Sequence, residues 1–363
     1  MVKAKTIKIA LIGYRLSGGG SDRVMARLSV FFENHGIEVH NLIVIDEVSY
    51  PFAGKLINLG LHKNQKNDIL NKFRRMVVLR RYLKQNKFDF IIDFRFRTKP
   101  LQELILAKLI YNATTIFTIH SYLINHYMPD ASWLTRLMYN SSYANVAVTN
   151  QIKEQIEIQH KLKNVVTIFN PIDILEIETK KNEAIDLKYQ FIIAIGQFEN
   201  PIKQFDLLIK NYAKSNLPQQ NIHLVILGEG DVSKLNKIIF ETNFQDKIHL
   251  LGYQDNPFKY LSKANFLVLS SQNEGLPNVI LEALACQTPV VAFDCPSGPR
   301  EILNRGNGIL VENQNWQELI SAMNKMIEED DFYTSCKRNT LESCSPFLLE
   351  TIGKQWLDLL KIE

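Results

Sequence analysis

Apolar and polar positions form two alternating patterns along the first half of the chain. Short runs of branched apolar residues occur at Ile7–Ile12 and Ile37–Ile45, and amphipathic segments with helical spacing occur at Asp22–Phe32 and Leu70–Asn86. Strands that alternate with helices in this way predict a doubly wound α/β fold with a parallel sheet. The same rhythm predicts further strands and one further helix, at Phe88–Asp93, Thr114–Ile119, Val146–Val148 and Val165–Ile168, and at Leu101–Leu109.

A polar stretch interrupts this pattern near the middle of the chain. Asn170-Pro171 is a turn signal, and residues 172–188 are rich in Glu and Lys, which predicts a linker. The alternation then restarts. Strands are expected at Phe191–Ile195, His223–Leu227, Ile248–Leu251, Phe266–Leu269 and Val290–Phe293, and helices at Phe205–Lys214, Ser233–Phe240, Asn278–Ala285 and Trp316–Glu328.

The sequence therefore predicts two α/β domains, residues 1–171 and 189–346. A length of 363 residues fits two domains of ordinary size. Residues 347–363 are expected to form a separate amphipathic helix, with Trp356 and Leu359 on one face. Ligands of doubly wound sheets bind at the carboxyl ends of the strands, so we expect the chemistry there.

Composition excludes several classes of protein. The net charge is +4, from 42 basic and 38 acidic residues, which gives no reason to expect a nucleic acid partner. None of the four cysteines has metal-ligand spacing, and we expect thiols in a reducing compartment. Neither a secretion signal nor a run of about 20 apolar residues occurs, which predicts a cytoplasmic protein, free or peripheral on a membrane.

One segment joins a buried strand, a loop glutamate and a helix. Glu274 follows strand Phe266–Leu269, a turn comes next, and Asn278 can open the helix that carries Glu282. Backbone amides at such a helix start can bind a diphosphate. From spacing alone, both glutamates could equally be ordinary solvated residues.

This segment resembles the signature of the family 4 glycosyltransferases, in which two glutamates are separated by seven residues. Gln287 replaces the usual glycine of the second element. Other motifs stand in the order of that family, so the resemblance is strong over residues 191–311. They are Leu227-Gly228-Glu229-Gly230, Leu251-Gly252-Tyr253, Asp255-Asn256-Pro257, Ala264-Asn265 and Gly308-Ile309-Leu310-Val311.

The resemblance implies the architecture called GT-B, with two Rossmann-like domains facing across a cleft and the last helix crossing back to the first domain. It assigns Glu274 to the hydroxyl groups of the donor sugar, Glu282 to the ribose and Tyr253 to the region of the base. The implied donor-binding turn consists of Gly275, Leu276, Pro277, Asn278 and Val279.

The implied reaction is sugar transfer with retention from a nucleotide diphosphate sugar to a glycan. UDP is expected as the nucleotide by family habit. The sequence has no Asp-x-Asp at a strand end, so we expect no metal and no cofactor. We favour front-face attack, in which the leaving diphosphate accepts the proton of the acceptor, because no carboxylate is placed as a covalent nucleophile.

Two further elements in the first half match the family. The loop Gly18-Gly19-Gly20 allows backbone amides to approach a phosphate or the acceptor closely, and we assign Gly19 and Gly20 to the donor. His120 ends a strand and matches a histidine beside the donor sugar, where it could stabilise developing positive charge. Without the resemblance, a loop without a ligand and a structural histidine are the alternatives.

The phosphate-binding element departs from the family pattern. Gln197 stands where an arginine is usual, and Lys203 follows at a slightly longer spacing. Losing a charged hydrogen bond predicts about tenfold weaker donor binding. We hypothesise that Arg300 compensates; the alternative is that Arg300 pairs with Glu301 or meets solvent.

Basic residues of the first half suggest an anionic acceptor. The helix at residues 70–86 carries Arg74, Arg75, Arg80 and Arg81 among apolar residues, which fits anionic lipid or a pyrophosphate, or else a solvated helix face. Arg95 and Arg97 follow a strand and are candidates for an acceptor phosphate. These cations are the support for a lipid-linked glycan acceptor.

Two rival functions stay open at this point. A sugar-nucleotide epimerase or a phosphorylase would share the fold class. A non-catalytic module that binds glycans or nucleotides is the second rival, and Gln197 is its best support.

Overall fold

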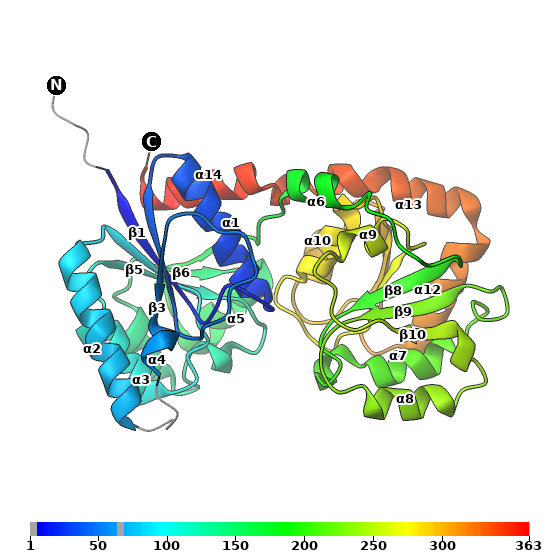
Figure 1. Cartoon of the computed structure of the whole chain (residues 1–363), viewed down its shortest axis with the longest axis horizontal. Coiled ribbons are helices and arrows are strands. Elements are labelled where there is room, and N and C mark those ends of the chain that lie inside the picture. The colour runs from blue at the N-terminus through cyan, green and yellow to red at the C-terminus, as the bar shows by residue number, and fades with distance from the viewer. Residues whose placement is uncertain (1–5, 64–68, 363) are drawn as a thin grey trace. The chain divides into compact units, whose positions relative to one another are not determined.

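The computed structural model describes residues 6–63 and 69–362, and the chain divides into two compact units. The first unit contains the chain up to Pro171 and again from Leu349 onward, and the second runs from Ile172 to Leu348. Each unit is a parallel sheet with helices on both faces (Figure 1). The described residues contain no helix long and apolar enough to cross a membrane.

The sheet of the first unit has the order β3-β2-β1-β4-β5-β6-β7, and all neighbouring strands are parallel. From β1 the chain adds strands on one side, as far as β3, and from β4 it adds them on the other side, as far as β7. The topological switch point of the sheet therefore lies between β1 and β4. The strands are β1 (Lys8–Gly13), β2 (Glu38–Ile43), β3 (Lys55–Asn58), β4 (Phe90–Asp93), β5 (Thr114–Ile119), β6 (Ala144–Ala147) and β7 (Val165–Thr167).

The helices of the first unit cover both faces of this sheet. One segment predicted as a single helix, residues 101–109, is α3 followed by a short π-helical turn at Leu106–Ile110. The helices are α1 (Gly20–Asn34), α2 (Ile69–Asn86), α3 (Pro100–Ile105), α4 (Ser132–Tyr139), α5 (Asn150–His160) and α14 (Leu349–Leu360).

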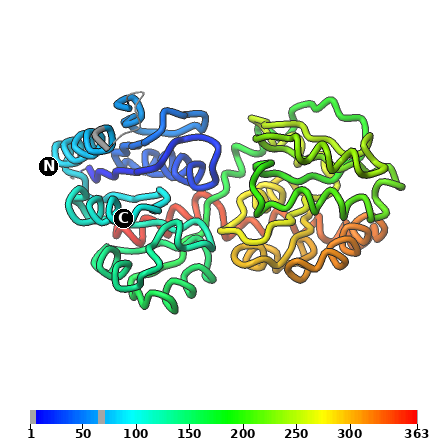
Figure 2. The backbone as a smooth tube through the Cα atoms, turned by 90° about the horizontal axis from the view of Figure 1, so that it is seen from below, coloured from blue at the N-terminus to red at the C-terminus, as the bar shows by residue number. Residues whose placement is uncertain are grey.

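Helix α14 belongs to the first unit although it is the last element of the chain. Its residues Ile352, Trp356 and Leu360 are buried in the core that α1 and the sheet share. Gly353 lies against the ring of Phe31 so closely that a Cβ atom would come within 2.3 Å of it. Figure 1 shows the red α14 beside the blue α1, and Figure 2 shows the red segment running among the segments of the first unit.

The sheet of the second unit has the order β10-β9-β8-β11-β12-β13, again parallel throughout. Its switch point lies between β8 and β11. The strands are β8 (Phe191–Ile195), β9 (His223–Leu227), β10 (Ile248–Leu250), β11 (Leu267–Leu269), β12 (Val290–Phe293) and β13 (Gly308–Val311).

The segment expected as a linker is part of the second unit. Residues Ile174–Lys180 form helix α6, and the amide of Asn256 and the hydroxyl of Ser262 donate hydrogen bonds to the carbonyls of Lys180 and Lys181. The other helices are α7 (Phe205–Tyr212), α8 (Ser233–Phe240), α9 (Phe258–Leu261), α10 (Asn278–Ala285), α11 (Pro299–Ile302), α12 (Trp316–Glu328) and α13 (Asp330–Ser343).

Candidate active site

The switch point of the second unit brings together two residues that lie far apart in sequence. Lys203 follows β8 and Glu274 follows β11, and the Lys203 Nζ atom lies 2.6 Å from Glu274 Oε1. Both side chains keep some contact with solvent, at 19% and 13% exposure. A cation and a carboxylate at the carboxyl ends of neighbouring strands can be shared with a ligand that carries both phosphate and hydroxyl groups.

Close packing of glycines positions Lys203. The aliphatic stem of Lys203 runs along Gly196, where a Cβ atom would lie 3.1 Å from Lys203 Cγ. A Cβ atom on Gly228 would lie 1.8 Å from the carbonyl oxygen of Gly196. Larger residues at these two strand ends would therefore displace the loop that carries Lys203.

The loop of Glu274 is fixed by the segment that follows β12. The Glu274 amide donates to the carbonyl of Pro296, and the Ser297 hydroxyl donates to the carbonyl of Gly275 at 2.9 Å. Gly298 has a φ of +100°, a conformation that favours glycine, and packs against Pro277. The predicted donor-binding turn of residues 275–279 is thus a rigid entry into α10.

Helix α10 begins at Asn278 without a side-chain cap among the described residues. Its dipole favours negative charge at this end. Glu282 lies one turn into the helix and is buried, whereas the sequence alone left a solvated glutamate open.

Three predicted donor residues lie on the surface of the second unit. Gln197 is exposed, and its side-chain amide donates to Glu229 Oε1 at 3.3 Å. Tyr253 is half exposed. Arg300 is largely exposed to solvent, as one alternative predicted, and it forms a bidentate ion pair with Asp294, a partner that the sequence did not suggest.

In the first unit, His120 directly follows β5 and is held as a neutral imidazole. Its Nε2 atom lies 2.9 Å from the hydroxyl oxygen of Thr118, which itself donates to the carbonyl of Asp93. The Nε2 atom therefore carries the proton. Burial, with a contribution from the Arg97 charge, lowers the pKa of His120 to about 3.

The glycine loop leads directly into α1. Gly19 precedes the helix and Gly20 opens it. A Cβ atom on Gly19 would lie 2.7 Å from Oδ2 of Asp22, so the carboxylate folds back over the loop. Burial raises the pKa of Asp22 to about 6, against the lowering effect of Arg15.

The expectation for Arg95 and Arg97 is corrected by the structure. Both are buried, and Arg97 is 1% exposed. Arg97 donates to the carbonyl oxygens of Asp93, Arg95, Thr118 and Tyr127. Its donors serve the fold, so an acceptor phosphate cannot use them without disrupting the sheet edge.

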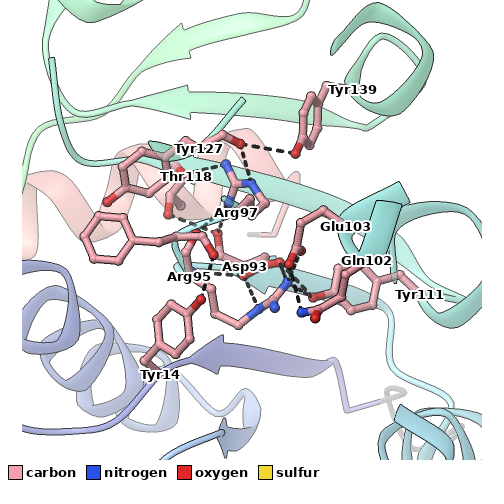
Figure 3. A network of polar contacts seen from close by, with 11 residues as sticks. Tyr14, Asp93, Arg95, Arg97, Gln102, Glu103, Tyr111, Thr118, Tyr127 and Tyr139 are labelled. Atoms are coloured by element: carbon pink, nitrogen blue, oxygen red, sulfur yellow. Dashed lines mark hydrogen bonds and ion pairs between the residues drawn. The ribbon is translucent and has the colours of Figure 1, made fainter. Parts of the chain in front are cut away.

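Arg95 forms the centre of a buried ionic network (Figure 3). It pairs with Asp93 at 2.7 Å and with Glu103 at 2.9 Å, and it donates to the hydroxyl of Tyr111. Burial favours the neutral acid, but the Arg95 and Arg97 charges hold the pKa of Asp93 below its usual value. Two cations and two carboxylates thus compensate one another inside the first unit.

The basic helix α2 presents a mixed surface. Arg74, Arg80 and Arg81 are exposed, together with Phe73 and Val77. Arg75 instead is partly buried and donates to the carbonyl of Val44 at 3.4 Å. The exposed side therefore carries both apolar and cationic side chains, with Arg74 beside Phe73 and Arg80 and Arg81 beyond Val77.

Two aromatic residues near the strand ends were not assigned from the sequence. Tyr14 and Phe96 follow β1 and β4 at the switch point of the first unit, and the Tyr14 hydroxyl donates to the Phe96 carbonyl. Their position directly after two buried strands is the signal that could have identified them. Among the described residues, no group of three or more His, Cys, Asp or Glu side chains could hold a metal ion.

Family models match nearly the whole chain. Residues 18–175 match the model described as Glycosyltransferase Family 4, and residues 176–343 match the model described as Glycosyl transferases group 1. The boundary between the two matches falls at the start of the second unit.

Two proteins of Campylobacter jejuni are similar over the full length. The first, named N-acetylgalactosamine-N,N'-diacetylbacillosaminyl-diphospho-undecaprenol 4-alpha-N-acetylgalactosaminyltransferase, is 30% identical over 97% of this chain and 99% of its own. The second, an alpha-1,4-N-acetyl-D-galactosaminyltransferase whose name specifies a PP-undecaprenol-linked glycan, is 23% identical over 98% of both chains.

A solved structure shares the fold. The HepE protein of Anabaena, determined in complex with UDP, superposes with a TM-score of 0.76 at 16% sequence identity. The superposition covers 98% of this chain and 100% of that one.

Proposed function

The chain belongs to the group 1 and family 4 glycosyltransferases, and from that premise we propose that it transfers an N-acetylhexosamine or hexose, with retention, from a UDP-sugar to a lipid-linked glycan. The observation that carries the proposal is the Lys203–Glu274 pair at the switch point of the second unit. The acceptors named for the two Campylobacter relatives support the lipid-linked glycan, and the UDP bound to HepE supports the nucleotide.

In the proposed reaction, the bond between the anomeric carbon and the β-phosphate oxygen breaks while an acceptor hydroxyl attacks the same face. The acceptor proton passes to the leaving phosphate oxygen. Lys203 and the N terminus of α10 stabilise the negative charge that develops on the diphosphate. Glu274 binds the sugar hydroxyls and Glu282 the ribose.

The positive charge that Lys203 would place at the diphosphate supports a reaction without a metal ion. A diphosphate leaving group needs a compensating positive charge, which other enzymes obtain from a divalent cation. Lys203 supplies that charge from the protein itself. A neutral His120 cannot act as a cation, and its Nε2 atom is engaged by the Thr118 hydroxyl, so its contribution is the dipole of its ring.

The decisive experiment combines the protein with candidate UDP-sugars and an undecaprenyl-diphosphate-linked glycan. UDP release that depends on the glycan, with a product heavier by one sugar residue, supports the proposal. Activity that persists after removal of divalent cations by EDTA supports the metal-free reaction. UDP-sugar isomerised without an acceptor indicates an epimerase, a requirement for inorganic phosphate indicates a phosphorylase, and binding without turnover indicates a binding module.

We also propose that α2 places the enzyme on the cytoplasmic face of a membrane, where a lipid-linked acceptor is found. Phe73 and Val77 are exposed by 66% and 41%, and Arg80 and Arg81 are exposed farther along the same helix. Apolar side chains that enter the interface, next to cations that meet anionic headgroups, are typical of peripheral binding.

Vesicle co-sedimentation tests this contact. Replacing Arg74, Arg80 and Arg81 with Gln is expected to weaken binding to anionic vesicles by more than tenfold, since each cation near the surface contributes about 1 kcal/mol. The matched control removes three exposed lysines of the same unit, Lys161, Lys163 and Lys354. Equal binding by the two triple variants contradicts a specific role of α2.

A further inference from the structure

At the switch point of the first unit, the aromatic residues Tyr14 and Phe96 have no role assigned so far. This point lies between β1 and β4, where the Tyr14 hydroxyl after β1 donates to the carbonyl of Phe96 after β4, at 3.0 Å. Ligands of open α/β sheets bind outside the carboxyl ends of the strands at such a point. The first unit therefore has a position for a ligand of its own.

Phe96 is held at this position with its side chain turned outward. It is 41% exposed, whereas the neighbouring Arg95 and Arg97 are 5% and 1% exposed. The two arginines are anchored by the buried network around Asp93 and by backbone carbonyls (Figure 3). A segment fixed on both sides of an exposed aromatic residue presents that ring in one orientation.

Other aromatic rings surround Phe96. Its ring centroid lies 5.0 Å from that of Tyr127, 6.0 Å from that of His126 and 6.3 Å from that of Tyr14. The Tyr127 ring in turn lies 6.4 Å from the ring of His120. A single aromatic ring thus separates Phe96 from the histidine assigned to the transfer reaction.

The charges near this cluster favour a neutral ligand with hydroxyl groups. The donors of Arg95 and Arg97 are used inside the protein, which leaves them poorly suited to a phosphate. Arg15, next to Tyr14, pairs with Glu47 at 2.6 Å and lies 3.6 Å from Asp22. Carboxylates of this kind accept hydrogen bonds from sugar hydroxyls.

We infer that the exposed ring of Phe96, flanked by Tyr14 and His126, is the platform on which the terminal sugar of the acceptor glycan stacks. The inference rests on the proposed glycosyltransferase function and adds an acceptor subsite to it. The carbon-bound hydrogens on one face of a pyranose ring pack against an aromatic ring, while its hydroxyls stay available to the carboxylates at the edge. The subsite selects for the shape of the acceptor sugar and does not bind its lipid diphosphate.

Steady-state kinetics with Phe96→Ala test the inference. The probes are UDP-N-acetylgalactosamine and an undecaprenyl-diphosphate-linked N-acetylgalactosaminyl-N,N'-diacetylbacillosamine. We expect the KM for the lipid-linked acceptor to rise about tenfold, with the KM for the UDP-sugar unchanged. Phe96→Trp should restore the acceptor KM, and Phe96→Leu should not, because an aromatic face is required. Phe240→Ala, which removes a 78% exposed ring from the second unit, is the matched control.

Saturation-transfer NMR with methyl α-N-acetylgalactosaminide gives a second measurement that needs no turnover. The wild-type protein should transfer saturation to the sugar ring protons, and the Phe96→Ala protein should lose most of this signal. Turnover with an unchanged acceptor KM in Phe96→Ala overturns the subsite and leaves the proposed function standing. Absence of turnover in the wild type with all candidate UDP-sugars and lipid-linked glycans contradicts the proposed function, and the NMR comparison then decides the subsite by itself.

Discussion

The two switch points of this molecule use charge in opposite ways. In the second unit, Lys203 and Glu274 form a pair that stays accessible at the strand ends. In the first unit, the arginines after β4 are buried and form ion pairs with Asp93 and Glu103 or hydrogen bonds with backbone carbonyls, and aromatic rings take the exposed positions. The same sheet architecture therefore presents a polar edge in one case and an aromatic edge in the other.

The difference distinguishes charged side chains that can bind a ligand from charged side chains whose partners lie inside the fold. A pair that keeps contact with solvent can exchange one partner for a phosphate, because water and the ligand can replace the lost contact. A buried pair cannot do so, because breaking it leaves an uncompensated charge in a poorly solvated place. This contrast suits a donor with a charged leaving group on one unit and an uncharged sugar acceptor on the other.

The largest expected effect comes from removing the accessible charge. Lys203→Ala should lower kcat/KM about 10²- to 10³-fold, because the leaving diphosphate loses its main source of positive charge. UDP release under steady-state conditions measures it. Lys234→Ala is the control, since Lys234 forms a similar 2.9 Å pair with Asp206 on the surface of the same unit. A Lys203→Ala enzyme within threefold of the wild type would place the phosphate site elsewhere.

Breaking the buried charge should instead reduce stability. Asp93→Asn preserves shape but leaves Arg95 undercompensated, and we expect a loss of about 3 kcal/mol in the free energy of unfolding of the first unit. Hydrogen exchange of the β4 amides under native conditions measures the change. Asp206→Asn, at an exposed pair, should cost less than about 1 kcal/mol. Similar losses in both variants would remove the contrast between the two edges.

A pH series sharpens the comparison at His120. Its pKa is about 3 in the folded protein and near 6.5 when unfolded, so the unfolded state binds more protons between these values. Stability contributed by His120 is therefore present above pH 6.5 and falls as the pH decreases, by about 1.4 kcal/mol per pH unit.

The measurement is the difference in unfolding free energy between wild type and His120→Asn from pH 7 to pH 4.5. This difference separates His120 from Asp22, whose raised pKa produces the opposite slope. The gap should shrink as the pH falls, and a constant gap would show that His120 is solvated in the folded state. The catalytic rate should show no titration of His120 between pH 5 and pH 8.

The smallest effect concerns the departure from the family pattern. Gln197→Arg adds a cation at the end of β8, and we expect UDP to bind about tenfold more tightly. Isothermal titration with UDP measures this change. Arg300→Ala tests whether that residue now replaces the missing arginine, and equal UDP affinity in Arg300→Ala and wild type would exclude it. Unchanged affinity in Gln197→Arg would show that position 197 does not face the diphosphate.

Much of the second unit could be predicted because local pattern and tertiary role agree there. Strands β8, β9 and β12 and helices α8, α10 and α12 have the predicted bounds.

Helix α5 of the first unit and helix α13 of the second were not predicted, because their apolar positions are sparse among polar residues. For α5, the N-cap Thr149, which accepts from the Ile152 amide, was the available signal.

The roles of Arg95 and Arg97 could not be predicted from their own neighbourhood. An Arg-Phe-Arg sequence suggests two exposed cations around a buried ring. The structure shows the opposite arrangement. Glu103 forms an ion pair with Arg95, and the carbonyls of Thr118 and Tyr127 accept hydrogen bonds from Arg97. Those partners come from other elements of the fold, so only the tertiary structure reveals them.

Helix α14 has a consequence for the order in which the protein is made. The larger part of the first unit precedes the second unit in the sequence, whereas Ile352, Trp356 and Leu360 of its core are synthesised only after the second unit. Until they arrive, Phe31 and its neighbours face solvent on one side. The first unit therefore reaches its final packing only after the second unit has been translated. During that interval the nascent chain exposes an incomplete hydrophobic surface, which favours aggregation.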